Sequence, residues 1–173
     1  MKICALVWLA VVDLLLLAIV PGVAAEHTAV GRVSVVDGDT IELHGERIRL
    51  AAIDAPESRQ TCRRGGDVWP CGRRAAFALA DHVGNRTVTC RWTERDRYRR
   101  PVATCRVGDG DLGAWLVERG WALAYRRYGM QYVIAEDRAR GARRGLWSGS
   151  FIPPWAWRRG NGAEVSATAW RGA

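Results

Sequence analysis

The most restrictive feature of this sequence is the stretch VVDGDTIELHGERIRLAAIDAPES, residues 35–58. Apolar and polar residues alternate in TIEL, residues 40–43, and in RIRLAAI, residues 47–53, which is the pattern of strands with one buried face. The letters HGE between them predict a tight turn, so we expect an antiparallel hairpin. VGRVSVV, residues 30–36, alternates in the same way and predicts a strand before the hairpin.

The alternation predicts which side chains of the hairpin face the core, because successive strand residues point to opposite faces. If Gly45 and Glu46 form a two-residue turn, Ile41 lies opposite Leu50. The residues expected to face inward are Ile41, Leu43, Ile48 and Leu50, and those expected to face outward are Glu42, Arg47 and Arg49.

Acidic residues stand at both ends of this hairpin. In the same register Asp39 faces Ala52 and Asp37 faces Asp54, so Asp39 and Asp54 are diagonal neighbours about 7–8 Å apart. Two carboxylates at this distance repel each other unless a cation lies between them. Glu57 follows a proline that stiffens the loop and holds this acid nearby. The donors are all oxygen atoms, which favours calcium over zinc or copper, although each acid alone is also compatible with an ordinary turn or strand end.

Downstream of the hairpin, the apolar periodicity predicts three helices and two further strands. The polar, Gly-rich residues 58–70 indicate a loop, and residues 151–173, rich in Gly, Pro and Trp, indicate a segment extended over the surface. This order is typical of an α+β protein, a five-stranded Greek-key β-barrel of the OB type with three α-helices. We expect strands at 86–92 and 101–107, and helices at 72–83, with Ala76, Phe77, Ala80 and Val83 on one side, at 111–120, with Asp111 as cap and Gly120 as stop, and at 132–145.

Residues 1–25 have the pattern of a secretory signal, with Lys2, a long apolar run and the small residues of PGVAA. An uncleaved anchor, and with it a membrane-bound envelope protein, is the alternative; Asp13 argues against it, because a central Asp costs about 2.5–3.5 kcal/mol on insertion. We therefore expect cleavage after Ala25, a domain at 26–150 and an extension at 151–173. The protein would be secreted or periplasmic, with no stable membrane association after cleavage.

Removal of the signal takes Cys4 away and leaves four cysteines, an even number that suits an oxidising compartment. Three pairings are possible, and the spacing does not fit a zinc site. Cys90 and Cys105 are symmetric about the middle of TERDRYRR, so a hairpin centred there would place them opposite each other and close a loop of about 15 residues. Cys62 and Cys71 would then join across the preceding loop.

The charge balance is basic, with 26 Lys and Arg against 18 Asp and Glu, and Lys2 is the only lysine. Guanidinium groups bind phosphate oxygens bidentately, so an arginine-rich face favours a nucleic-acid partner. A basic surface that is merely solvated remains the alternative.

The segments DGDTIEL, RIRLAAIDAPE, DRYRRPVA, LVERGWALAYRRY and RRGLW resemble the staphylococcal nuclease, or thermonuclease, family from Val30 to Trp147. The resemblance implies an OB barrel with three helices and hydrolysis of the phosphodiesters of DNA and RNA with calcium. The products would carry 3′-phosphates. We expect a monomer that prefers single-stranded nucleic acid.

The resemblance also implies roles for individual residues. Attack of water on a phosphodiester builds charge on the phosphate oxygens, which arginines and a cation stabilise, and a carboxylate must take the proton of the water. The implied calcium ligands are Asp39, Asp54 and the main-chain carbonyl of Ala55, with Asp37 behind them; the implied general base is Glu57, and the phosphate-clamping arginines are Arg49 and Arg100. Arg97 and Tyr98 match positions near the terminal phosphate, and Tyr125 and Tyr128 fall near the base-stacking tyrosines, where ordinary packing is an equal alternative.

This sequence departs from the family pattern at two glycines. Arg99 stands where the family has glycine and Pro101 follows the motif, so either Arg99 or Arg100 could reach the phosphate. Ala52 stands where many relatives have glycine. The competing function is an OB-fold module that binds single-stranded nucleic acid without cutting it, for which a basic groove and nine Trp would suffice. The combined set of Asp39, Asp54, Glu57, Arg49 and Arg100 favours the nuclease.

Overall fold

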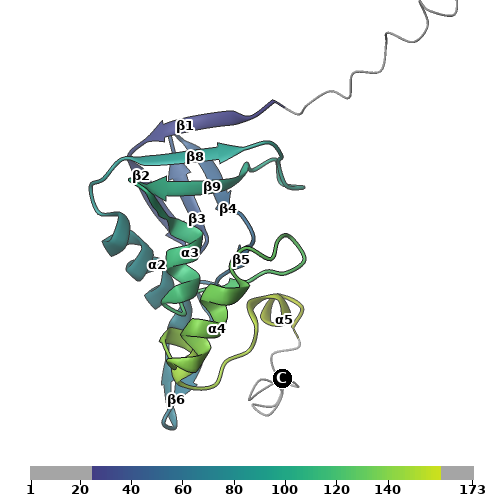
Figure 1. Cartoon of the computed structure of the whole chain (residues 1–173). Helices are drawn as coiled ribbons and strands as arrows, with labels where there is room; N and C mark the ends of the chain where they lie inside the picture. The colour runs from purple at the N-terminus through teal and green to yellow at the C-terminus, as the bar shows by residue number, and fades with distance from the viewer. Residues whose placement is uncertain (1–24, 161–173) are drawn as a thin grey trace, which may run out of the picture.

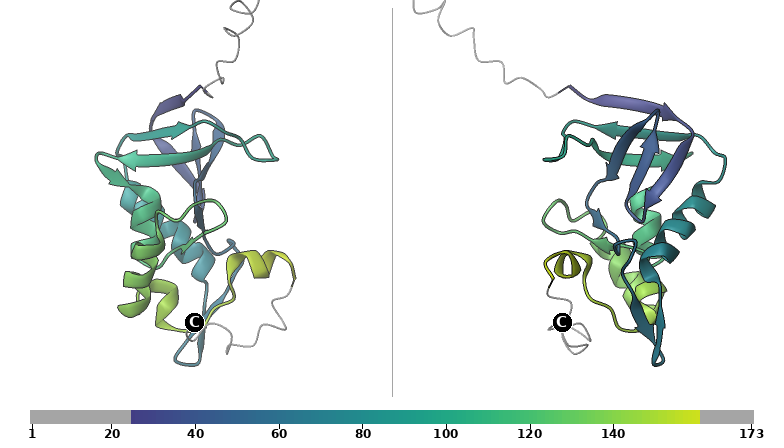
Figure 2. Two further views of the ribbon diagram at one scale, coloured as in Figure 1. Left: turned by 45° about the vertical axis from the view of Figure 1, so that its right-hand side comes forward. Right: turned by 180° about the vertical axis from the view of Figure 1, so that it is seen from behind.

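The computed structural model describes residues 25–160; the signal predicted at 1–25, save its last residue, and the end of the extension lie outside this range. The strands form a barrel, and the helices gather at one end of it (Figures 1 and 2). The barrel strands are β1 (His27–Gly31), β2 (Val33–Asp37), β3 (Thr40–Leu43), β4 (Glu46–Leu50), β8 (Val88–Trp92) and β9 (Val102–Val107). Short strands are β5 (Ile53–Asp54), β6 (Cys62–Arg64), β7 (Asp67–Trp69), β10 (Gly110–Asp111) and β11 (Leu123–Ala124). The helices are α2 (Cys71–Val83), α3 (Leu112–Glu118), α4 (Val133–Gly141), α5 (Pro154–Arg158) and the 3-10 helix η1 (Gly145–Ser148).

The strand order β1-β8-β9-β4-β3-β2 is that of an OB barrel. β1 and β2 are the two halves of one bent strand, separated only by Arg32, so the two ends of the path belong to the same stretch of chain. The strand predicted at 30–36 is this bent strand, which begins earlier, at His27. β4 and β9 run parallel, and the other neighbouring pairs of the barrel are antiparallel. The predicted α+β fold of the OB type is confirmed.

The turn of the β3–β4 hairpin lies one residue earlier than predicted. Ile41 pairs with Ile48, and not with Leu50. The turn residues are His44, with φ of 53°, and Gly45, with φ of 79°, and two left-handed residues are what a type I′ turn requires. Because the register changes by two residues, no side chain changes face. The four residues expected inside are all exposed by 2% or less.

The single strand predicted at 47–53 is interrupted in the structure. β4 ends at Leu50, and Ala52 has a φ of 56°, so the chain bends there before β5. The carbonyl of Ala52 accepts a hydrogen bond of 2.9 Å from the amide of Tyr125, and β5 pairs with β11. The bend moves Asp54 out of the barrel sheet to the end of the barrel where the helices lie.

The three predicted helices are found as α2, α3 and α4, but α5 is a fourth α-helix within residues 25–160. It lies in the segment that we expected to be extended. The buried side of α2 carries Ala75, Leu79 and Val83, whereas Phe77 is 63% exposed. Of the face predicted for this helix only Val83 is buried, and the rest of that prediction is wrong. Residues 58–70 contain the β6–β7 hairpin rather than a plain loop. Asp111 caps α3 as predicted and accepts a hydrogen bond of 2.9 Å from the amide of Ala114.

Both predicted disulfides are present. Cys90 pairs with Cys105 across β8 and β9, and Cys62 is joined to Cys71, which links β6 to the start of α2. Two disulfides indicate an oxidising compartment outside the cytoplasm. Within residues 25–160 we find no helix with the length and apolarity needed to cross a membrane.

Candidate active site

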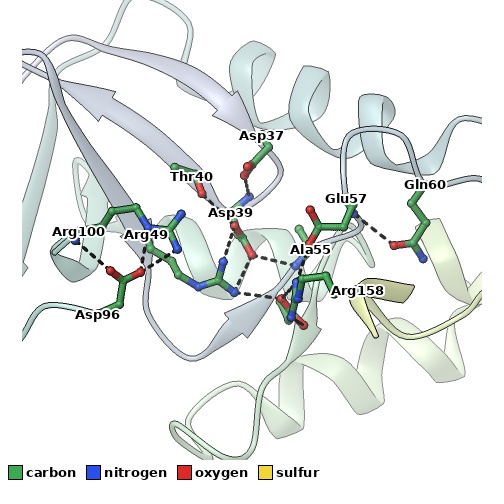
Figure 3. A network of polar contacts seen from close by, with 11 residues as sticks. Asp37, Asp39, Thr40, Arg49, Ala55, Glu57, Gln60, Asp96, Arg100 and Arg158 are labelled. Atoms are coloured by element: carbon green, nitrogen blue, oxygen red, sulfur yellow. Dashed lines mark hydrogen bonds and ion pairs between the residues drawn. The ribbon is translucent and has the colours of Figure 1, made fainter. Parts of the chain in front are cut away.

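Asp39 and Asp54 converge on Arg49, which binds both carboxylates. Figure 3 shows Asp39 beside Arg49. Asp39 lies in the β2–β3 turn, Asp54 ends β5 and Arg49 projects from β4. The guanidinium of Arg49 donates to Asp39 at 3.1 Å and to Asp54 at 3.0 Å. The convergence was predicted, but the predicted pairing of Asp37 with Asp54 is wrong, because the bend at Ala52 brings Asp54 to this place.

Asp39 is held almost out of solvent, with 4% of its surface exposed. Its carboxylate accepts hydrogen bonds from the Thr40 hydroxyl at 3.1 Å and from the Ala55 amide at 3.2 Å. The Asp39 amide in turn donates to the Asp37 carboxylate at 3.1 Å. Burial raises the pKa of Asp39 to about 7; Arg49 opposes this shift, and the negative charges of Asp37 and Asp54 add to it. The site therefore holds a carboxylate that an additional positive charge would stabilise.

Arg49 is fixed by the same acids. Burial is the largest single influence and disfavours its charge, but Asp39 and Asp54 together outweigh it and raise the pKa of Arg49 above its ordinary value. Its side chain is 21% exposed, so the charged group remains accessible from solvent. Arg49 can thus present a permanent positive charge to an anion at the mouth of the site.

Glu57 stands on the loop that follows β5. Its amide donates to the Gln60 side-chain oxygen at 3.2 Å, and Gln60 is fully buried, so this contact fixes the loop. The Glu57 side chain is 39% exposed, in contrast to the buried Asp54. A carboxylate in this position can meet solvent water, which a general base requires.

The β8–β9 turn brings Arg100 beside Arg49, because the Arg49 amide donates to the Pro101 carbonyl at 2.9 Å. Arg100 binds the Asp96 carboxylate through Nε at 2.8 Å and through Nη2 at 2.7 Å. Its guanidinium is therefore held in one orientation. Arg99 has a φ of 65°, the left-handed conformation that suits the family glycine. The turn therefore keeps the backbone conformation that suits glycine, although Arg99 occupies the position. Of the two arginines, Arg100 is the one whose guanidinium is oriented by Asp96.

Comparison with known proteins agrees with this geometry. The family model described as staphylococcal nuclease homologue matches residues 47–149. The chain belongs to the staphylococcal nuclease family. It is 37% identical over 134 residues to an "Uncharacterized endonuclease" of Escherichia coli O157:H7, covering 73% of this chain and 82% of that protein. It is 37% identical over 145 residues to a "Micrococcal nuclease" of Shigella flexneri, covering 73% and 78%.

A third relative carries a different name. The "Succinoglycan biosynthesis protein ExoI" of Rhizobium meliloti (strain 1021) is 40% identical over 129 residues, which cover 71% of this chain and 66% of that protein. The chain thus spans slightly less than two thirds of this relative. The family and the endonuclease names support a nuclease, an enzyme that hydrolyses phosphodiester bonds, over the non-catalytic OB module.

This nuclease has one site residue that our reading of the sequence missed. Arg158, on α5, donates to both carboxylate oxygens of Asp54, at 2.9 and 2.7 Å, and to Glu57 at 2.7 Å (Figure 3). It lies beyond the part of the chain that the family model matches. The only signal in the sequence is PPWAWRR, where two prolines and two tryptophans suggest a packed segment that carries arginines.

The two tyrosines expected near the substrate lie side by side in the nuclease. The ring centroids of Tyr125 and Tyr128 are 5.0 Å apart, and Tyr128 is 61% exposed. Trp155 of α5 stacks on the other tyrosine, Tyr125, at 5.6 Å with an interplanar angle of 3°. Tyr128 also borders a hollow of about 300 Å³ whose lining includes Ala52, Trp92 and Val102. Tyr98, on the β8–β9 turn, is 70% exposed, with Arg97 and Arg100 over its ring at 5.6 and 5.4 Å.

The donors at this site fit a hard cation such as calcium, because they are carboxylate oxygens. Three carboxyl groups, of Asp39, Asp54 and Glu57, face two guanidinium groups, so the acids outnumber the arginines. Within residues 25–160 no three His, Cys, Asp or Glu side chains form a ready metal cluster. Asp39 and Asp54 would therefore hold the ion together with main-chain or water oxygens, and Ala55, which donates its amide to Asp39, is next to both.

Proposed function

We propose that this nuclease hydrolyses DNA and RNA in a calcium-dependent reaction that leaves 3′-phosphates. The observation that carries the proposal is the network of Asp39, Asp54, Arg49 and Glu57, which combines oxygen donors, a fixed guanidinium and an accessible carboxylate. Each group corresponds to one requirement of phosphodiester hydrolysis: a cation site, charge stabilisation and a base.

In this mechanism Asp39 and Asp54, with the Ala55 carbonyl, would hold calcium, and calcium would neutralise charge on the phosphate. Asp37 orients the Asp39 backbone through the hydrogen bond to its amide. Glu57 accepts a proton from the attacking water, whose oxygen forms a bond to phosphorus. The P–O5′ bond breaks, and the 5′-oxygen leaves as a hydroxyl after taking up a proton. Arg49 and Arg100 stabilise the charge that builds on the phosphate oxygens.

The surroundings of the site support a single-stranded substrate. Tyr98 and Tyr128 are exposed aromatic side chains, and Arg97 adds positive charge at the ring of Tyr98. Stacking on exposed aromatics needs unpaired bases, which a duplex does not offer. Tyr125 would complete the stacking surface once its own partner moves away.

The working form would be a monomer, secreted or periplasmic, that begins at Glu26 after removal of residues 1–25. The two disulfides support export, since they need an oxidising compartment. N-terminal sequencing of exported protein should find Glu26, and an intact Met1 would contradict this.

The deciding experiment incubates the purified protein with single-stranded DNA and with RNA, in calcium, in a chelator, and in the chelator with calcium restored. We expect cleavage only with calcium, and fragments whose 3′ ends become extendable after phosphatase treatment. Unchanged cutting in the chelator would refute the calcium dependence. Binding without cutting under every condition would refute the catalytic proposal.

A further inference from the structure

The C-terminal helix α5 lies against the candidate active site. Figures 1 and 2 show it beside β5, at the helical end of the barrel. The family model ends at residue 149, so this helix is an addition to the matched domain. Its contacts are made with residues that the proposed reaction itself requires.

Arg158 binds two of the three acids on which the proposed reaction depends, Asp54 and Glu57. Its Nη1 atom is 2.9 Å from Asp54 Oδ1 and 2.7 Å from Glu57 Oε1, and its Nη2 atom is 2.7 Å from Asp54 Oδ2. Both oxygens of Asp54 are thereby engaged, one of them also by Arg49 at 3.0 Å. An oxygen of Glu57 that accepts a charge-assisted hydrogen bond is a weaker acceptor for the proton of water.

Trp155, on the same helix, covers Tyr125. The two rings are parallel within 3° and their centroids are 5.6 Å apart, which is the geometry of a stacked base and aromatic side chain. One short helix therefore places a cation at the acids and an aromatic ring on a tyrosine expected to bind a base. Arg158 and Trp155 thus lie at the places expected for calcium and for a nucleobase of the substrate.

The helix is tethered just before its start. Ser150 and Arg63 exchange two backbone hydrogen bonds of 2.9 Å, and the Gln60 side chain donates to the Ile152 carbonyl at 2.6 Å. Arg63 follows Cys62, whose disulfide to Cys71 fixes this part of the chain. The anchor is thus independent of Arg158, so the helix can leave the site without leaving the domain.

We propose that Arg158 is an active-site residue that competes with calcium for Asp54 while it occupies the general base Glu57, and thereby sets the calcium concentration at which the site loads. Arg158 lies on α5, and this helix would move away from Tyr125 when calcium binds. The inference rests on the proposed calcium-dependent function.

Competition follows from the charges. Arg49 bonds only Oδ1 of Asp54 and would leave Oδ2 for calcium, whereas Arg158 bonds both oxygens. Calcium could not bind Oδ2 beside Arg158 without close contact between positive charges, so each disfavours the other. Arg49 differs from Arg158 because it binds Asp39 and Asp54 but leaves Glu57 alone. Arg158 takes the Glu57 oxygen as well, so its departure frees the cation ligand and the general base together.

The test is calorimetric titration of the purified protein with calcium, without nucleic acid. Arg158→Ala should bind calcium about tenfold more tightly than the wild type, the size expected when a competing ligand is removed. Arg158→Lys, which keeps the charge, should bind more weakly than Arg158→Ala. Arg159→Ala is the matched control, because it removes the same charge from the adjacent exposed residue, and it should change the affinity less than twofold.

Trp155→Ala provides a second variant that does not touch the acids. It should also tighten calcium binding, though less than Arg158→Ala does, because the docked state of α5 is weakened. Hydrogen exchange at residues 154–160 should speed up when calcium is added to the wild type. An Arg158→Ala variant whose calcium affinity falls, or shifts no more than that of Arg159→Ala, overturns the proposal, and so does calcium binding with α5 still protected. If neither the wild type nor any variant binds calcium, the proposed calcium-dependent function is itself refuted. If calcium binds but Arg158→Ala does not bind it more tightly, only the proposal about Arg158 is refuted.

Discussion

Arg49 joins Asp39 to Asp54, with its Nη2 atom 3.0 Å from an oxygen of each carboxylate. The three residues come from β4, from the β2–β3 turn and from β5, so the contact ties the barrel to the bend that follows it. Neither acid could be buried here without compensation, because an unpaired buried charge is costly. Arg49, which compensates the two acids, therefore lies where a phosphate would meet calcium in the proposed reaction.

The first prediction separates the base from the cation ligands. Glu57→Gln should lower kcat by about 10²–10⁴-fold, because the amide cannot accept the proton of the water. Calcium binding, measured by calorimetry, should persist, whereas Asp54→Ala should lose it. Wild-type cutting rates in Glu57→Gln would remove this residue from the role of base.

The second prediction concerns the arginines. Arg49→Ala and Arg100→Ala should each lower kcat by about 10²–10³-fold, since both are proposed to stabilise charge that develops in the transition state. Arg99→Ala is the neighbouring control and should act mainly by reducing the dependence of binding on salt. The assay is steady-state cleavage of single-stranded DNA at several salt concentrations. Equal losses of kcat at Arg99 and Arg100 would show that the Asp96 contact does not select the functional arginine.

Much of the barrel could be predicted because a strand repeats every two residues. The parity of Ile41 and Leu43 survives any register change by an even number, so the buried set was correct although the turn was not. The turn itself depends on two left-handed residues, and His-Gly is not one of the dipeptides, such as Asn-Gly or Asp-Gly, that predict a type I′ turn. The break at Ala52 was missed because alanine does not predict a left-handed conformation either.

The contribution of α5 could not be predicted from local patterns. Arg158 meets Asp54 and Glu57 across separations of 104 and 101 residues, and α5 is only 5 residues long. A helix this short shows too little apolar periodicity to indicate a buried face. What positions it is the tether at Ser150 and Ile152, which is a property of the folded domain.

The third prediction tests the strained turn. Arg99→Gly should raise the free energy of unfolding by about 0.5–1 kcal/mol, because glycine adopts a positive φ without the clash of a Cβ atom. Arg97→Gly, at a position of the same turn without a positive φ, should not stabilise. Urea denaturation measures both, and a less stable Arg99→Gly would mean that the arginine side chain contributes more than the strain costs.

The fourth prediction concerns the Cys90–Cys105 disulfide. The two residues are 15 apart in sequence and opposite each other in β8 and β9. Replacing both with Ala should lower the free energy of unfolding by about 3 kcal/mol, mainly because the unfolded chain is no longer closed into a loop. Peptide mapping without reduction should find the pair intact in the wild type, and a link from residue 62 to 90 or 105 would contradict the structure.

The fifth prediction uses the raised pKa of Asp39, which burial brings from 3.8 to about 7 in the metal-free protein. Between these two pH values the folded state binds more protons at Asp39 than the unfolded state does. The contribution of Asp39 to stability should therefore be fully present below about pH 4 and should be lost as the pH rises through about 7. Urea denaturation in a chelator should show this fall in the wild type and not in Asp39→Asn, which carries no titrating group there.

Two controls bear on that prediction. Asp81→Asn, which removes an exposed carboxylate on α2, should keep the pH dependence of the wild type. Calcium should abolish the fall near pH 7, because it binds the ionised form of Asp39 and stabilises the folded state in proportion to its occupancy. Its affinity should accordingly increase as the pH rises towards 7. If the metal-free wild type keeps constant stability across this range, Asp39 is already ionised in the folded protein and Arg49 neutralises it more fully than its burial suggests.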